Sequence, residues 1–238
     1  MTTTQLQPVR QIRLPGQEAA PEGPIDMIGM FLMHHAFRRD LSAFSRAVAA
    51  TPVADQPTWQ ALADRWARFR HVLHSHHTRE DTHLWPQVTD KARAAGDTEA
   101  VATLNAMHAE HAEIDPLLES VAQGLGRLAT TPDRDVRAAL EVRMAATRDC
   151  LAQHLAHEER DALAIAQRLF TPEEWEGMEH GQKESLRELA FLVPWVFHRL
   201  PADAWPRTAK FGGPLMVTIA RLFRRRFERR ERAAFRYA

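Results

Sequence analysis

Cysteine is almost absent from this chain, because Cys150 is its only thiol. A single cysteine excludes an intrachain disulfide and a zinc cluster built from cysteine alone, and it is typical of proteins from a reducing compartment. Free cysteine is among the most buried residue types. We therefore expect Cys150 to be a small core residue.

Long apolar runs are also missing. The longest one, from Leu189 to Phe197, contains Pro194 and is far shorter than the roughly 20 residues that a membrane-spanning helix needs. The first residues show no basic flank followed by an apolar core, which is the pattern of a secretory signal. We expect a soluble cytoplasmic protein.

An excess of either charge is lacking overall, since 31 lysines and arginines balance 31 aspartates and glutamates. This balance argues against a surface built wholly for nucleic acid, and no sequence-specific nucleic-acid binding is expected. The exception is 221–238, where eight arginines accompany only Glu228 and Glu231, a formal charge of +6 that leaves −6 on the other residues. We expect this basic end to dock on the acidic remainder of its own or a second chain. Contact with an anionic membrane or with nucleic acid is the alternative.

Sustained strand alternation does not occur, whereas apolar residues recur at spacings of three and four over long stretches. That period is typical of amphipathic helices. It predicts four of them, at about 25–50, 58–95, 98–128 and 132–170, with Pro86 kinking the second. Long helices with short connections favour an up-down-up-down four-helix bundle, so we assign the chain to the all-α class.

Both ends of the chain differ from this bundle. Residues 1–23 are rich in Thr, Gln, Pro and Gly without an apolar stripe, and we expect a mobile leader there. We assign 24–170 to the bundle and 171–238 to a helical extension with additional short helices. The extension opens with Thr171-Pro172-Glu173-Glu174, in which a cap, a proline and a capping-box glutamate predict a helix start.

Histidine is the residue type in excess: there are 13, and eleven of them lie between residues 34 and 157. Five histidines and two adjacent carboxylates crowd into 71–86. Residues four apart on a helix share one face. Two pairs in this stretch have that spacing, His76 with Glu80 and His77 with Asp81.

The same spacing returns in His154 and Glu158, and each of the other two helices carries a histidine on its apolar side, His34 and His111. A buried carboxylate is costly unless it is paired or binds a metal, because an isolated ion loses its hydration. Imidazoles with bridging carboxylates suit a pair of first-row metals better than magnesium or calcium. We predict six metal ligands: His34, His76, Glu80, His111, His154 and Glu158.

Ordinary structure explains each of these features singly. A lone inward histidine is more often a hydrogen-bonded core residue, and a lone His-x-x-x-Glu pair is more often solvated. The metal site is favoured because two such pairs occur together with inward histidines on the other two helices. Other metal motifs fit less well, since a ferritin-type site needs two Glu-x-x-His pairs and only Glu80 and His83 have that spacing.

Four sequence elements together resemble a known family. They are His34-His35-Ala36-Phe37-Arg38-Arg39-Asp40-Leu41, His76-His77-Thr78-Arg79-Glu80-Asp81-Thr82-His83-Leu84-Trp85-Pro86, Glu110-His111-Ala112-Glu113-Ile114 and His154-Leu155-Ala156-His157-Glu158-Glu159. With them, the chain from about Ile25 to Phe170 resembles the hemerythrin-like, or HHE cation-binding, domain family. The resemblance implies a non-haem, carboxylate-bridged pair of iron ions in a four-helix bundle, with zinc or manganese as alternatives. It also implies oxygen, nitric oxide or peroxide as the small ligand.

The alignment of these elements separates neighbouring candidates. It favours some residues over their neighbours: His76 and Glu80 over His77 and Asp81, and His34 over His35. The remaining histidines are expected to be solvated or to orient the metal ligands from outside: His71, His74, His77, His83 and His157.

The third helix departs from the family pattern. Oxygen-carrying hemerythrins place two histidines four apart there, whereas Met107 stands four before His111 and His108 only three before, which leaves His108 as the alternative to His111. Fewer histidines leave more open coordination, which favours redox reactivity or sensing over reversible oxygen carriage. We therefore expect a protein that reacts with or senses a small ligand. The alternative is a metal-stabilised interaction module without turnover.

Overall fold

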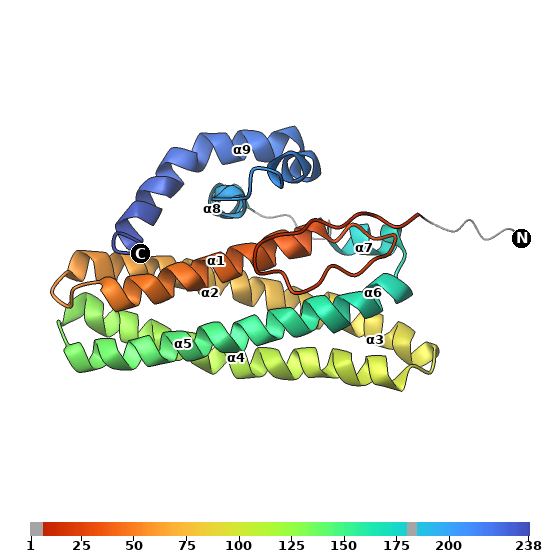
Figure 1. Ribbon diagram of the computed structural model, residues 1–238, viewed down its shortest axis with the longest axis horizontal. Coiled ribbons are helices and arrows are strands. Elements are labelled where there is room, and N and C mark those ends of the chain that lie inside the picture. The colour runs from red at the N-terminus through yellow and green to blue at the C-terminus, as the bar shows by residue number, and fades with distance from the viewer. Residues whose placement is uncertain (1–6, 180–184) are drawn as a thin grey trace, which may run out of the picture.

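The computed structural model of the chain describes residues 7–179 and 185–238. Helices dominate these ranges, and no strand occurs within them (Figure 1). None of the helices in the described ranges is both long and apolar enough to cross a membrane.

Four long helical segments form the bundle, as the sequence predicts. They are α1 (Ile28–Ala50), α2 (Gln56–Arg79) continuing through η1 (Glu80–Leu84) into α3 (Trp85–Ala94), α4 (Thr98–Thr130), and α5 (Arg134–His157) continuing through η2 (Glu158–Ala162) into α6 (Leu163–Leu169). Short connections join consecutive segments, so that they run up and down side by side (Figure 1). The all-α bundle predicted from helical periodicity is confirmed.

Aspartate side chains fix where three of these helices begin. Asp55, Asp97 and Asp133 each accept a hydrogen bond from a backbone N–H in the first turn of α2, α4 and α5. Such a cap stabilises a helix by about 1 kcal/mol. Pro116 lies inside α4, the third of these segments, without ending it.

Two π-helical turns interrupt the bundle at equivalent places. Glu80 is the first residue of η1 and Glu158 is the first residue of η2. A π turn inserts one extra residue into an α-helix and occurs often at functional sites. The sequence predicted a kink of the second segment at Pro86. The irregularity instead begins six residues earlier, at Glu80.

The bundle core is divided into two apolar clusters. One contains Phe44 and Trp66, whose rings meet edge to face at 4.9 Å, and lies towards the turn between α1 and α2. The other contains Phe31, Leu104 and Leu163 and lies towards the opposite end. The buried histidines and glutamates occupy positions between these two clusters along all four segments.

The leader differs from the mobile segment that its composition predicts. Within its described part, Ile12 and Leu14 are buried in the second cluster. The Gln11 amide donates to the Ile25 carbonyl at 2.6 Å, and the backbone N–H of Glu18 donates to Glu159 at 2.7 Å. Glu18 and Glu159 are 141 residues apart in the sequence. An apolar pattern within the leader therefore cannot predict this packing.

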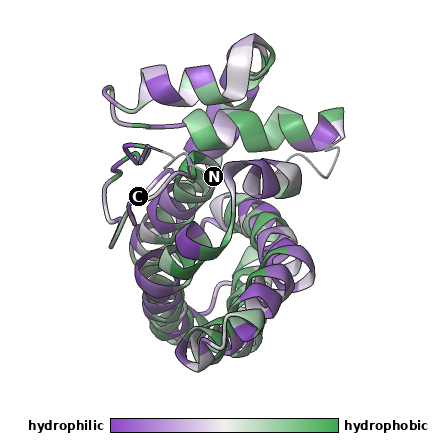
Figure 2. Ribbon diagram, turned by 90° about the vertical axis from the view of Figure 1, so that its right-hand side faces the viewer, coloured by the Kyte–Doolittle hydropathy of each residue, from purple (hydrophilic) through white to green (hydrophobic). Residues whose placement is uncertain are grey.

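The extension adds a second layer over one side of the bundle. It consists of α7 (Pro172–Glu179), α8 (Leu186–Phe197) and α9 (Trp205–Ala234), and α9 bends at Gly213, whose φ is 66°. In Figure 1, α8 lies between α9 and the bundle, and Figure 2, which looks along the bundle, shows the same layer above it. The predicted helix start is confirmed, because Thr171 and Glu174 cap each other's backbone N–H groups.

The basic end packs on its own bundle mainly through apolar residues, and one of its arginines, Arg236, lies 3.8 Å from Asp55 at the start of α2. Phe227 and Ala234 are buried in the first cluster, and the Phe235 ring lies 5.0 Å from that of Phe44. All eight arginines of 221–238 are exposed. Apolar contact, together with the ion pairs of Glu231 with Arg65 and of Arg236 with Asp55, therefore holds this part of the chain in place.

A buried charge cluster also ties the layers together. Arg65 of α2 is 3% exposed, donates to Glu231 of α9 at 2.5 Å and forms a second hydrogen bond with Asp40 of α1. The indole of Trp195 in α8 donates to the same Asp40 carboxylate at 2.7 Å. Burial alone would raise the pKa of Asp40, but the guanidinium groups of Arg65 and Arg39 and the indole hold that pKa below its usual range.

We predict that Asp40→Asn lowers the free energy of unfolding by about 3–5 kcal/mol at pH 7, because Arg65 loses one of its two buried partners. A carboxyl whose pKa is lower in the folded state stabilises the protein above its unfolded pKa, and this contribution is lost as the pH falls. In urea titrations, the difference in the free energy of unfolding between wild type and variant should become smaller below about pH 4. Asp64→Asn, at an exposed position, is the control and should behave as wild type.

Candidate metal centre

Seven side chains of the types that can bind a metal converge in the middle of the bundle. They form two groups, and in each group the donor atoms lie within 4.8 Å of one another. The three-histidine group consists of His77, His111 and His154, and the mixed group consists of His34, His76, Glu80 and Glu158. Every one of these residues is buried. The structure thus brings together all six residues proposed from the sequence and adds His77 to them.

The two carboxylates stand between the groups. Glu80 places Oε1 at 3.0 Å from His76 Nε2 and Oε2 at 3.6 Å from His111 Nε2. Glu158 Oε2 lies 3.2 Å from His34 Nε2 and 3.7 Å from His154 Nε2. Each glutamate therefore has oxygen within reach of ligands from both groups, which is the arrangement that a bridging carboxylate requires.

Three further carboxylates orient the histidines from outside. Asp81 Oδ1 lies 2.9 Å from His111 Nδ1, and Glu110 Oε2 lies 2.8 Å from His154 Nδ1. With Nδ1 engaged in this way, the Nε2 atom of each ring is directed towards the centre of the bundle. These outer partners fix both the tautomer and the orientation of the imidazole rings.

The third such carboxylate, Glu159, is the most firmly held. It lies 2.9 Å from His34 Nδ1, accepts two hydrogen bonds from Arg38 at 2.6 and 3.0 Å, and accepts the backbone N–H of Glu18 from the leader. The packing of the leader therefore reaches the metal-binding residues through a single carboxylate.

His77 is the residue that the sequence alignment set aside. Its ring stacks on that of His111 at 4.0 Å between centroids and meets His154 edge-on at 5.3 Å. Burial and the neighbouring His111 lower its pKa, so the ring is neutral and suited to a metal. Since α2 supplies this third imidazole, the lack of a second histidine on α4 does not reduce the histidine count. The geometry therefore removes the premise that a histidine is missing, on which the argument for open coordination depends.

The other histidines take different places. His35 Nδ1 points to the Pro15 carbonyl at 3.4 Å, and His108 is exposed with Nδ1 at 3.2 Å from Asp81. His157 shares Glu110 with His154, at 2.7 Å. Neither His35 nor His108 belongs to a metal-binding group.

Burial couples the charges of the mixed group. It opposes the charging of His34, but the Glu158 and Glu159 carboxylates outweigh it and raise the pKa of His34 to about 10. Burial and the charge of Glu158 raise the pKa of Glu80 to about 8, whereas burial and His34 lower the pKa of His76 to about 3. Both shifts favour the protonated forms of His34 and Glu80, and a metal ion that binds there would displace these protons.

The hydrogen-bond pattern tests whether these side chains fit a metal. Seven buried nitrogen and oxygen atoms of the two groups make no hydrogen bond, although some of them lie close to one another. They are Nε2 of His34, His76 and His77, and both carboxylate oxygens of Glu80 and of Glu158. Buried polar atoms are rarely left unpaired, because each costs about 1–3 kcal/mol. Unpaired atoms that converge as nitrogen and carboxylate donors fit a pair of first-row metal ions.

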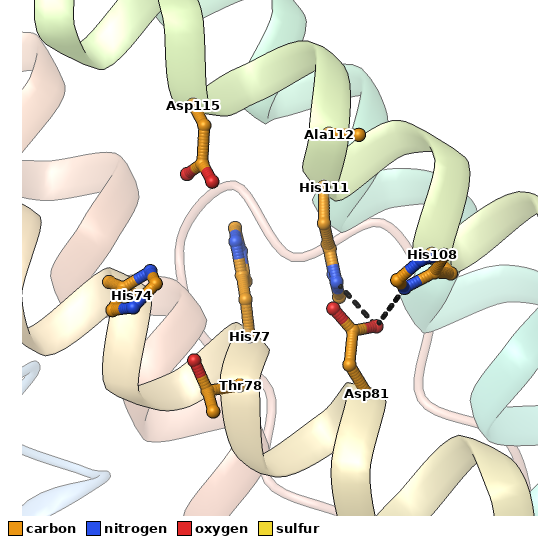
Figure 3. Close-up of a pocket in the computed structure, with 8 residues that line it drawn as sticks. All are labelled: His74, His77, Thr78, Asp81, His108, His111, Ala112 and Asp115. Carbon is orange, nitrogen blue, oxygen red and sulfur yellow. Dashed lines mark hydrogen bonds and ion pairs between the residues drawn. The ribbon is translucent and has the colours of Figure 1, made fainter.

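A polar pocket of about 160 Å³ leads to the three-histidine group between α2 and α4. Figure 3 shows the His77 and His111 rings side by side in this pocket, with Asp81 between His111 and the exposed His108. The pocket is large enough for a few water molecules or a diatomic ligand.

We predict that Glu110→Gln weakens metal binding by about 10–100-fold, because His154 and His157 lose the carboxylate that orients them. Competition with a chelator of known affinity measures the change. Glu113→Gln provides the matched control, since Glu113 is exposed on the same helix. Equal affinities for the two variants would contradict an orienting role for Glu110.

Comparison with known proteins agrees with this geometry. A model of the hemerythrin HHE cation-binding domain matches residues 29–166, which is more than half of the 238 residues and covers every residue of the two metal-binding groups. Searches of curated proteins and of solved structures gave no match. The chain therefore belongs to the hemerythrin HHE cation-binding domain family.

Proposed function

We propose that the protein binds two iron ions without haem and reacts with or senses oxygen, nitric oxide or peroxide. The observation that supports this most strongly is the pair of shared carboxylates, Glu80 and Glu158, each within 3.7 Å of imidazoles from both groups. Five imidazoles and two carboxylates favour iron, with zinc or manganese as alternatives.

The residues would divide the work by position. His77, His111 and His154 would hold one ion, His34 and His76 would hold the other, and the two glutamates would bridge them. A bound iron pair supplies redox chemistry and a position for a small ligand. The protein supplies orientation through the outer carboxylates, and the two apolar clusters close the bundle on both sides of the site along the helix axes.

The polar pocket gives protons and small ligands a route to the site. Asp81 lies 3.2 Å from exposed His108 and 2.9 Å from buried His111, so it connects the surface with the three-histidine group. A carboxylate between two imidazoles can accept and release a proton without moving.

The alternative function is a metal-stabilised interaction module without turnover. Both functions require bound metal, but only the first predicts a chemical change when peroxide or nitric oxide is added. A zinc-loaded structural site would be colourless and would not respond to either reagent.

We predict about two irons per chain with oxo-bridge absorption in the visible range for the wild type. His111→Ala should lose about one iron and that absorption, because the three-histidine group keeps only two ligands. His108→Ala removes an exposed histidine of the same helix and should retain both irons. Metal analysis and the absorption spectrum give the result. Zinc as the only bound metal, or equal iron content in both variants, would contradict the proposal.

The basic end and the single cysteine carry two further proposals. We place the protein in the cytoplasm, because a single cysteine, Cys150, is typical of proteins from a reducing compartment. We also propose that the exposed arginines of α9 contact an anionic membrane or nucleic acid, because they are not used in packing on the bundle.

We predict that replacing Arg225 and Arg229 by Gln weakens binding to anionic vesicles or to DNA, whichever the wild type binds, in a sedimentation or gel-shift assay. Both side chains are exposed, so folding should be unchanged. Arg137→Gln and Arg143→Gln on α5 form a control of equal charge. Wild-type protein that binds neither surface would leave only the packing role of this helix.

A further inference from the structure

A second cavity, much larger than the polar pocket, lies between the bundle and the extension. Its volume is about 680 Å³. Residues of α1 and of the α2–η1 segment form one wall, and residues of α7, α8 and α9 form the other. Figure 1 shows the layer of α8 and α9 above α1 and α2.

The cavity borders a different group of candidate metal ligands from the one that the polar pocket borders. His76 and Glu80 of the mixed group line it, and both are buried. The polar pocket instead borders His77 and His111 of the three-histidine group. Each group therefore has its own opening, one polar and small, the other large.

Polar and apolar residues are segregated on the cavity walls. Most of the lining is apolar, including four methionines that come from both layers, Met30, Met33, Met178 and Met216. Methionine side chains adapt to ligands of varied shape. The charged and imidazole groups all come from the α2–η1 segment at spacings of three and four: His76, Arg79, Glu80 and His83.

The volume decides what kind of molecule fits. One water molecule takes up about 30 Å³ in the liquid. Oxygen, nitric oxide and peroxide have only two heavy atoms each, so they are far smaller than this cavity. A cavity of about 680 Å³ falls within the range of roughly 300–1,000 Å³ that is typical of sites for organic ligands. A diatomic ligand alone does not account for it.

We propose that this cavity binds an elongated apolar molecule with a single anionic end, of the class of straight-chain monocarboxylic acids. The hydrocarbon chain lies among the methionines between the two layers. The anionic end lies against the polar residues of the α2–η1 segment, beside the guanidinium of Arg79 and the ring of His83 and next to the mixed group. This inference goes beyond the proposed function, because it rests on the walls of the cavity and not on a bound metal.

The test measures binding of saturated straight-chain acids of 6 to 18 carbons to the purified full chain, by displacement of a fluorescent fatty-acid analogue. The affinity should rise by about fourfold for each added methylene until the chain outgrows the cavity, and then fall. The amine of the best chain length should bind at least about tenfold more weakly, because its charge is opposite. An affinity that rises without a maximum, or equal binding of acid and amine, would overturn the proposal.

A pair of glycine variants places the binding site. Gly177 of α7 lines the cavity, and a Cβ added there meets no atom within 4 Å. Gly177→Phe should therefore fold normally and fill part of the cavity, which should shift the best chain length to shorter acids and weaken the longest ones by about tenfold or more. Gly126→Phe is the matched control, because Gly126 is an exposed helical glycine of α4, also with open space around its Cβ and outside the cavity. Identical chain-length profiles for the two variants would overturn the location.

Metal-stripped and iron-loaded protein are both measured, so that the two proposals fail separately. Saturable acid binding without iron uptake would contradict the proposed function alone. Two irons per chain without saturable acid binding would contradict this inference alone.

Discussion

Two buried glutamates without hydrogen-bond partners, in the middle of a helical bundle, are the constraint on which the rest of the site depends. Glu80 and Glu158 are 3% and 0% exposed, so water does little to stabilise a negative charge on either of them. The five imidazoles that surround them, the proton held by His34 and the outer carboxylates all serve to make these two residues tolerable there. A cation between them satisfies this requirement most directly.

The helices meet that constraint through their local geometry. Each glutamate is the first residue of a π turn, so the extra residue alters the register of its helix directly after the glutamate. Each ligand sits on a long helix rather than on a loop, and three of the imidazoles are fixed by a carboxylate on Nδ1. Such support is what holds ligands close to a required geometry when a metal is exchanged or a small ligand binds.

Sequence periodicity was enough to predict the bundle and the six residues proposed as ligands, because both depend on spacing within single helices. His77 was missed for a physical reason: the alignment assumed that the two His-x-x-x-Glu segments contribute equally, whereas His77 turns towards His111 of a different helix. The buried leader and the large cavity depend on contacts between residues more than a hundred positions apart, such as Glu18 with Glu159. No local pattern records contacts of this kind.

The cluster of Asp40, Arg65 and Glu231 has a consequence for how the molecule comes apart. Its three charges come from α1, α2 and α9, so detaching the extension would leave Arg65 and Asp40 in the core without Glu231 and Trp195. Unpaired buried charge is costly enough to make partial opening unfavourable. We therefore expect the boundary near Phe170 not to separate two independent folding units. Bundle and extension should unfold as one cooperative unit, in which the roof of the cavity and the buried histidines and glutamates are lost together.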